Sequence, residues 1–226
     1  MAARGTDRRP GAEDFLPPVE GLSPGRALTE LRQAATGCRG CELYEDAEQT
    51  VFGEGPVSAT MLLIGEQPGN VEDRRGHPFV GPAGRVLHDA LEHIGADERR
   101  IFLTNAVKHF RWRAAEGTAR RLHQTPSRGQ AVACRPWLVA ELDVVRPSVV
   151  VALGSVAAQS LLGSGFTLTR HRGEALPWPE DLPGRVSHGL FVTVHPSAVL
   201  RAPDAQRTEF RHGFERDLRQ AWEALG

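Results

Sequence analysis

Polar side chains that could contact a ligand follow three short apolar segments of the chain. Glu66 and Gln67 follow the segment 59–65, Asn105 lies near the end of 99–107, and His195 lies near the end of 189–197. An amide both donates and accepts hydrogen bonds, and an imidazole can do either according to its protonation. These side chains suit a planar heterocycle with polar edges.

An aromatic ring could complete such a site. Phe79 lies in the glycine-rich segment "GHPFVGPAG", between a proline and a Gly-Pro turn. Its ring either offers a flat stacking face or fills the core beneath its own loop, and residue type alone favours the second. Combined with Gln67, Asn105 and His195, the stacking face favours a nucleobase as the ligand.

The basic stretch between Lys108 and Arg128 is a candidate phosphate-facing surface. It holds four arginines between those two residues against one acid, Glu116. The net charge of the chain is −1, which does not argue for or against nucleic acid, because binding depends on where the charge lies. The stretch also contains His123, and its alternative interpretation is a solvated basic loop.

The three cysteines have the spacing of a metal site rather than of a disulfide framework. Cys38 and Cys41 form a C-x2-C pair, and Cys134 lies in the predicted helix 128–145. Metal sites of this kind normally need a fourth ligand, and the chain has no fourth cysteine.

The elements that position these residues alternate between strand and helix. The hydrophobic pattern predicts strands over 59–65, 99–107, 147–154 and 189–197, a short extended piece near 167–176, and helices over 83–95, 128–145 (capped by Ser127), 155–163 and within 206–225. Such alternation predicts a three-layer α/β/α fold with a mainly parallel four-stranded sheet. Ligands of these sheets bind beyond the carboxyl ends of the strands.

The 226 residues suit one domain over 26–226, preceded by a mobile arm over 1–25 that is rich in proline, glycine and charge. No apolar run is long enough to cross a membrane and no secretory signal is visible, so we expect a cytoplasmic protein without a membrane partner. We expect a monomer.

Four motifs in order resemble the uracil-DNA glycosylase superfamily, in particular its iron-sulfur branch: "GEQPG", "GHPFVGPAG", "TNAVK" and "HPSAVLR". The resemblance covers about residues 35–220. It implies that uracil is flipped out of DNA, stacks on Phe79, is read on its Watson-Crick edge by Asn105 and leaves as an anion stabilised by His195. Arg201 and Ser197, a candidate helix cap, would hold flanking phosphates.

By the same resemblance, the position that usually carries the fourth cysteine of that branch is His109. We therefore expect a structural [4Fe-4S] cluster held by Cys38, Cys41, His109 and Cys134, since imidazole can replace thiolate on cluster iron. A Cys3His zinc site is the alternative, and spacing alone favours zinc.

The loop "ARRLH" and the histidine at position 109 are similar to features of the X-type subgroup of these glycosylases. In that subgroup a loop histidine bonds to C1′ of the deoxyribose after uracil leaves, which implies this role for His123. Glu66 could accept or orient the histidine proton. Arg120 and Arg121 would contact phosphates and anchor the loop.

Gln67 could position water, contact uracil, or do both. Three functions stay open at this point: a glycosylase that traps itself on uracil-containing, preferably single-stranded DNA, a turnover glycosylase that releases uracil repeatedly, and a non-catalytic binder of uracil or damaged DNA.

Overall fold

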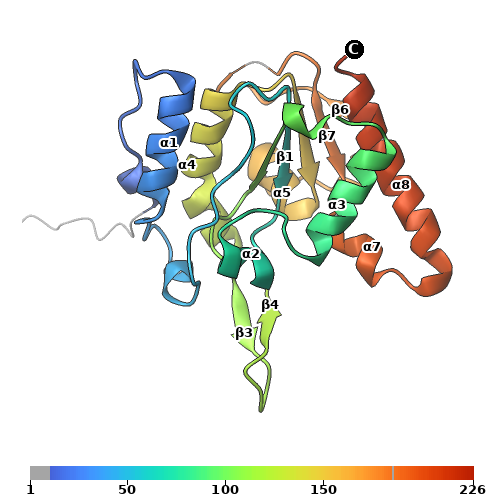
Figure 1. Ribbon diagram of the computed structural model, residues 1–226, viewed down its shortest axis with the longest axis horizontal. Coiled ribbons are helices and arrows are strands. Elements are labelled where there is room, and N and C mark those ends of the chain that lie inside the picture. The colour runs from blue at the N-terminus through green and yellow to red at the C-terminus, as the bar shows by residue number, and fades with distance from the viewer. Residues whose placement is uncertain (1–10, 185) are drawn as a thin grey trace, which may run out of the picture.

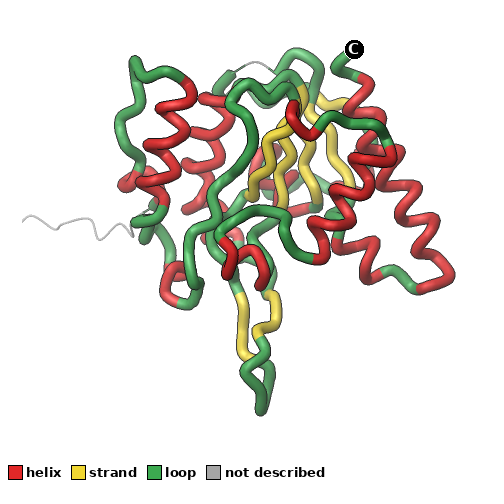
Figure 2. The backbone as a smooth tube through the Cα atoms, in the orientation of Figure 1, coloured by secondary structure: helices red, strands yellow, loops and turns green. Residues whose placement is uncertain are grey.

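The computed structural model of the protein describes residues 11–184 and 186–226. A five-stranded sheet lies between two layers of helices (Figures 1 and 2). Its strand order is β2-β1-β5-β7-β6, and only β6 runs antiparallel to its neighbour. The strands are β1 (Met61–Gly65), β2 (Ile101–Asn105), β5 (Val149–Leu153), β6 (Ala175–Leu176) and β7 (Leu190–Thr193).

The parallel strands are buried on both faces, which explains why they read as continuous apolar runs. Alternate residues of β1 enter opposite cores: Leu62 and Ile64 pack with one layer of helices, whereas Met61 and Leu63 pack with the other. The register of the sheet aligns Gly65 with Asn105, so the expected ligand residues meet at one edge.

The helices connect the strands and cover the sheet (Figure 1). Ser127 caps α4 as expected: its hydroxyl accepts a hydrogen bond from the Gln130 backbone N–H at 3.2 Å. The helices are α1 (Pro24–Ala35), α2 (Asn70–Arg75), α3 (Pro82–His93), α4 (Arg128–Val145), α5 (Ser155–Leu162), α6 (Leu168–His171), α7 (Ser197–Arg201) and α8 (Asp204–Glu223), with short 3-10 turns η1 (Ala12–Phe15), η2 (Glu42–Glu45) and η3 (Glu98–Arg100).

A separate two-stranded hairpin projects from the carboxyl-end edge of the sheet (Figures 1 and 2). It consists of β3 (Trp112–Ala114) and β4 (Arg121–His123), with Trp112 opposite His123. The basic stretch 108–128, for which a loop is one interpretation of the sequence, therefore contains both strands of this hairpin. Pairing with β3, rather than an apolar period of its own, makes β4 extended.

The three-layer α/β/α class is confirmed, but the expected number of four strands is wrong because β6 adds a fifth at the edge. This strand lies at the end of the segment 167–176 that the sequence predicts to be extended, whereas the earlier part of that segment forms the short helix α6. Among the described residues no helix is long and apolar enough to cross a membrane.

The segment expected as a mobile arm over 1–25 falls into two parts. Residues 1–10 lie outside the described residues. From residue 11 onward the chain is packed: Ala12 is fully buried, η1 contacts α4, and Phe15, Leu16 and Val19 pack against the core. Three isolated apolar side chains anchor this proline-rich segment, and such anchoring leaves no periodic pattern in a sequence.

Candidate functional site

Asn105 and Phe79 meet above Gly65 at the carboxyl end of β1. A Cβ atom at Gly65 would collide with Asn105 Oδ1 and would lie 2.7 Å from Phe79 Cζ. The absence of a side chain at Gly65 therefore makes room for an amide edge beside an aromatic ring.

The backbone of Phe79 is held in a strained conformation. Its φ of 56° is in the left-handed region, which is uncommon for a bulky residue, and its side chain is buried. A Cβ at Gly84 would overlap the Phe79 carbonyl oxygen. Strain of this kind persists only where the surroundings fix it, and it is typical of ligand sites.

His195 follows β7 and faces the same edge of the sheet. Its Nδ1 accepts a hydrogen bond from the Ser197 backbone N–H at 3.2 Å and lies 2.8 Å from the Ser197 hydroxyl. A neutral imidazole bonded in this way carries its proton on Nε2. Burial, and then the charge of Arg201, lowers the pKa of His195 to about 4, so the ring is neutral at neutral pH and Nε2–H is a donor.

Ser197 does not cap α7 as expected. Pro196 occupies the N-cap position, and α7 begins at Ser197. The Ser197 hydroxyl contacts His195 instead, because a side chain two residues further along can reach the imidazole.

His123 is presented to Glu66 by the hairpin. His123 Nε2 lies 3.3 Å from Glu66 Oε1, and the His123 ring stacks on Phe110 with 6.0 Å between ring centroids. Glu66 Oε1 is buried and has no aligned hydrogen-bond donor among the described residues, so the contact with His123 is close but not yet a hydrogen bond. Catalytic hydrogen bonds often tighten only when substrate binds.

The surroundings of His123 favour its neutral form. Burial, and then Arg201, lowers the pKa of His123. Burial raises the pKa of Glu66, opposed by Arg201 and by a hydrogen bond with Thr125. Because a neutral imidazole has a free lone pair, this environment suits a nucleophile beside a proton acceptor.

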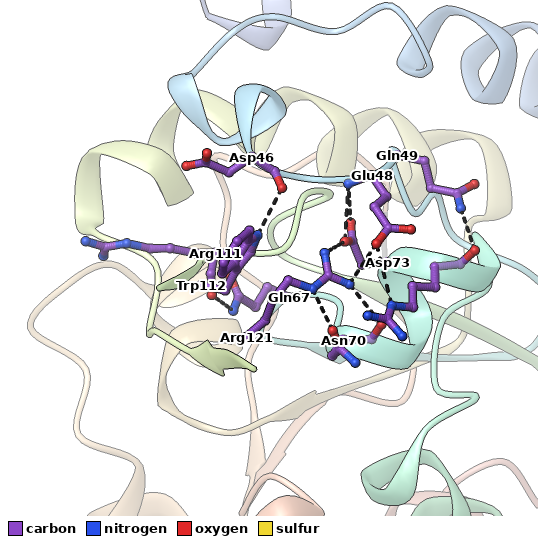
Figure 3. Close-up of polar contacts among 10 residues, drawn as sticks. Asp46, Glu48, Gln49, Gln67, Asn70, Asp73, Arg111, Trp112 and Arg121 are labelled. Atoms are coloured by element: carbon purple, nitrogen blue, oxygen red, sulfur yellow. Dashed lines mark hydrogen bonds and ion pairs between the residues drawn. The ribbon is translucent and has the colours of Figure 1, made fainter. Parts of the chain in front are cut away.

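Arg121 is an internal anchor of the hairpin, which differs from the phosphate contact expected for it (Figure 3). Its side chain is only 7% exposed, and its guanidinium donates to the fully buried Asp73 at 2.7 Å and to Asn70 Oδ1 at 2.7 Å. Glu48 lies 3.1 Å from the same group. Arg120, by contrast, is exposed and free of such pairing in the contacts described.

Gln67 also holds the hairpin. Its Oε1 accepts the Arg111 N–H at 2.9 Å, and its Nε2 donates to the Arg111 carbonyl at 3.1 Å (Figure 3). The same Nε2 also donates to the Gln124 carbonyl at 3.1 Å. The oxygen and the nitrogen of the Gln67 amide both bind the main chain next to the two strands of the hairpin. The amide is therefore engaged within the protein rather than with a ligand. Sequence reasoning missed this role and the anchor at Asp73, since each joins residues far apart in the chain.

Arg120 and Arg121 are therefore expected to behave differently when substituted. R120A should reduce the slope of log binding constant against log salt by about 0.7 on single-stranded DNA if it loses one phosphate contact. R121M should leave the slope unchanged but lower the free energy of unfolding by about 3 kcal/mol, because Asp73 would stay buried without its cation. Binding to a uracil-free strand at several salt concentrations, with denaturant unfolding, checks both. If R121M reduced the salt slope of DNA binding and left the free energy of unfolding unchanged, the role of Arg121 as an internal anchor would be contradicted.

The acid stability of the protein should depend on His195. Its pKa is about 4 in the folded chain and about 6.5 when unfolded. Between these values only the unfolded chain binds the proton, so stability falls by about 1.4 kcal/mol per pH unit as pH decreases. The stability advantage of wild type over H195N, measured by denaturant unfolding, should shrink across this window. A difference in unfolding free energy that stays constant over this pH range would contradict the lowered pKa of His195.

The candidate metal ligands gather between α1 and α4. Cys38 and Cys134 belong to one buried cluster and Cys41 packs against it, and all three thiols are free; burial raises the pKa of Cys134 to about 12. Cys134 Sγ accepts the Lys108 backbone N–H at 3.2 Å, and Cys38 Sγ accepts the Trp137 indole N–H at 3.2 Å. Donors of this kind stabilise metal-bound thiolates.

His109 is buried with one ring nitrogen left available. The Thr50 hydroxyl donates to the Ala35 carbonyl at 2.9 Å and therefore accepts from His109 Nε2 at 2.8 Å. His109 Nδ1 then carries the free lone pair that a metal needs. These donors fit a metal site chemically, although among the described residues no group of three His, Cys, Asp or Glu side chains is arranged to hold a single ion.

Comparison with known proteins identifies the family. Residues 52–224 match the model of the uracil DNA glycosylase superfamily. The chain belongs to the uracil-DNA glycosylase superfamily. It is 33% identical to a type-4 uracil-DNA glycosylase of Pyrobaculum aerophilum, over 81% of this chain and 89% of the relative. A type-4 enzyme of Archaeoglobus fulgidus is 30% identical, over 88% and 94%, respectively. Asn105, Phe79 and His195 thus gather at the strand ends of a uracil-DNA glycosylase superfamily member.

Proposed function

We propose that the protein excises uracil from DNA and becomes covalently attached through His123 to C1′ of the abasic site. The observation that carries this proposal is the 3.3 Å approach of His123 Nε2 to Glu66 Oε1. The contact brings a neutral imidazole and a carboxylate to the edge of the sheet that holds Asn105 and His195. Membership of the superfamily supports uracil as the base.

In the first step, a flipped uracil stacks on Phe79 and pairs its edge with the Asn105 amide. The bond between C1′ and N1 breaks, and its electron pair leaves with uracil. The Nε2–H of His195 stabilises the negative charge that develops on the base, which is the role of a preorganised donor. Extruding the nucleotide costs least on a single strand, so we expect single-stranded DNA to be preferred.

In the second step, a ring nitrogen of His123 donates its lone pair to the electron-poor C1′ and forms a C–N bond. The other ring nitrogen then loses its proton to Glu66, which leaves a neutral N-alkylated imidazole. This product is a poor leaving group until it is reprotonated, so the adduct persists. The capture resembles that of a sugar by a carboxylate in retaining glycosidases.

The exposed side chain of Arg120, with Ser197 at the first position of α7 and Arg201 at its last, would contact flanking phosphates. We assign Gln67 and Arg121 to holding the hairpin rather than to contacting DNA, because their polar groups are already bonded within the protein.

The ratio of released uracil to protein tests the proposal against its two alternatives. A labelled single strand with one uracil is mixed with limiting protein, and free uracil is counted. About one uracil per protein supports trapping. Many uracils per protein would support a turnover glycosylase, and no uracil would support a non-catalytic binder.

We further propose that Cys38, Cys41, His109 and Cys134 hold a [4Fe-4S] cluster of structural function. The cluster would tie the segment after α1 to α4. No disulfide joins these two parts, because all three cysteines are free. The three neighbouring thiols, their N–H donors and the free Nδ1 of His109 support this ligand set.

Anaerobically prepared protein should show visible absorption and contain iron and inorganic sulfide in about a 1:1 ratio, as the cluster formula requires. H109A should lose stability and iron, since a buried site would lack one ligand. Colourless protein that contains zinc would contradict the cluster and favour the Cys3His alternative.

A further inference from the structure

The ammonium group of Lys108 is fully buried directly behind Asn105. Both Lys108 and its partner Glu141 have side chains that are 0% exposed, and Nζ lies 2.7 Å from Glu141 Oε2. Nζ also donates to Thr104 Oγ1 and to the Asn105 carbonyl oxygen, both at 2.7 Å. An ammonium group has three N–H donors, so all three are used.

Glu141, on α4, is bonded as completely as its partner. Its Oε1 accepts the Gly53 backbone N–H at 2.9 Å, and its Oε2 accepts the Thr104 hydroxyl at 2.7 Å in addition to Lys108. A buried ion pair is seldom a better stabiliser than an apolar pair of similar volume. The charges therefore need an explanation other than stability.

The pair fixes the turn that carries Asn105. After Asn105 the chain leaves β2, and the N–H groups of Ala106 and Val107 donate to the carbonyls of Gly65 at 2.9 Å and Glu66 at 3.0 Å. Lys108 Nζ then reaches back three residues and binds the Asn105 carbonyl. The Lys108 ammonium group thereby holds the main chain of Asn105, while the Asn105 side chain lies over Gly65.

The same residue also touches the cysteine site. The Lys108 backbone N–H donates to Cys134 Sγ at 3.2 Å, and its neighbour His109 is a candidate ligand. One residue thus joins the base-reading turn at its side chain and the thiol site at its main chain.

We propose that Lys108, neutralised by Glu141, is a positioning residue that fixes Asn105 for reading uracil and couples its placement to the cysteine site. This inference rests on the proposed function, because it assigns Asn105 to the base. It predicts that the buried charges act on base recognition rather than on stability alone.

The test uses the double variant K108M/E141Q, because K108M alone would leave a buried carboxylate unpaired and could fail to fold. The glutamine can still bind Gly53 and Thr104, and the methionine fills the volume but cannot hold the Asn105 carbonyl. Single-turnover release of uracil is measured against DNA concentration for wild type, K108M/E141Q, N105A and the triple variant. Denaturant unfolding and iron content serve as controls for fold and metal site.

We expect K108M/E141Q to fold but to release uracil about 100-fold more slowly at low DNA concentration, because a displaced contact group has an effect of that order. N105A should then reduce the rate of uracil release much less in the K108M/E141Q background than in wild type, because the effects of coupled residues are not additive. The side-chain amide resonances of Asn105 should also shift in K108M/E141Q.

Additive effects together with unshifted Asn105 amide resonances would overturn the positioning role while leaving uracil excision intact. Absence of uracil release from the wild type would instead overturn the proposed function. The resonances report the placement of Asn105 in either case, so the two failures are distinguishable.

Discussion

H123A is expected to lose the boil-resistant complex with uracil-containing DNA entirely while still releasing uracil. The side chain of His123 is the nucleophile that we assign to C1′, and alanine has no lone pair to replace it. We assign breakage of the glycosidic bond instead to Asn105, Phe79 and His195. Denaturing gels of a labelled strand, with free uracil counted in parallel, measure the two steps separately.

The matched control for H123A is E66Q. It retains the nucleophile but lacks a carboxylate to accept the imidazole proton, so we expect adducts to form more slowly or to last for a shorter time. Retention of a boil-resistant band by H123A would assign the covalent bond to another residue. An E66Q variant that traps DNA as fast and as durably as wild type would remove Glu66 from the mechanism.

H195A should reduce the rate of uracil release by about 10²- to 10³-fold, as loss of one oxyanion donor does in other enzymes. The structure provides the reason: the Ser197 backbone N–H bonds to Nδ1 and burial keeps the ring neutral, so Nε2 carries the proton and can act as a donor. Single-turnover rates of uracil release under saturating DNA check the magnitude.

S197A is the control variant for H195A. It removes the hydroxyl at 2.8 Å but retains the Ser197 backbone donor to Nδ1, so the tautomer should persist and the loss should be smaller than in H195A. Equal losses in the two variants would contradict a role of the backbone N–H in fixing the tautomer. An H195A variant with the wild-type rate would exclude His195 from stabilising the departing base.

The sheet could be predicted from the sequence because its signal is local. Each parallel strand is a run of mainly apolar residues, such as Val149–Leu153, and each ends at or next to a polar residue or a glycine. Since parallel strands end at one edge, the placement of Asn105 and His195 at the same edge of the sheet followed from the order of elements.

The parts that could not be predicted depend on contacts between distant residues. Arg121 reads as a surface cation in sequence, yet it is buried by Asp73 and Glu48, which lie 48 and 73 positions earlier in the chain. The extended piece near 167–176 was predicted, but its antiparallel pairing with β7 as a fifth strand of the sheet was not. Likewise, the burial of Lys108 could not be predicted, because its partner Glu141 lies on α4, 33 positions later in the chain.

The identity of the residue that bonds to DNA tests the central claim most directly. The protein is incubated with a single strand containing one uracil, digested with trypsin and nuclease, and the nucleotide-bearing peptide is sequenced by mass spectrometry. Cleavage after Arg121 and Arg128 isolates the peptide 122–128, in which we expect the sugar, without uracil, on His123. An attached sugar on any other residue, or none on any peptide, would contradict covalent capture by His123.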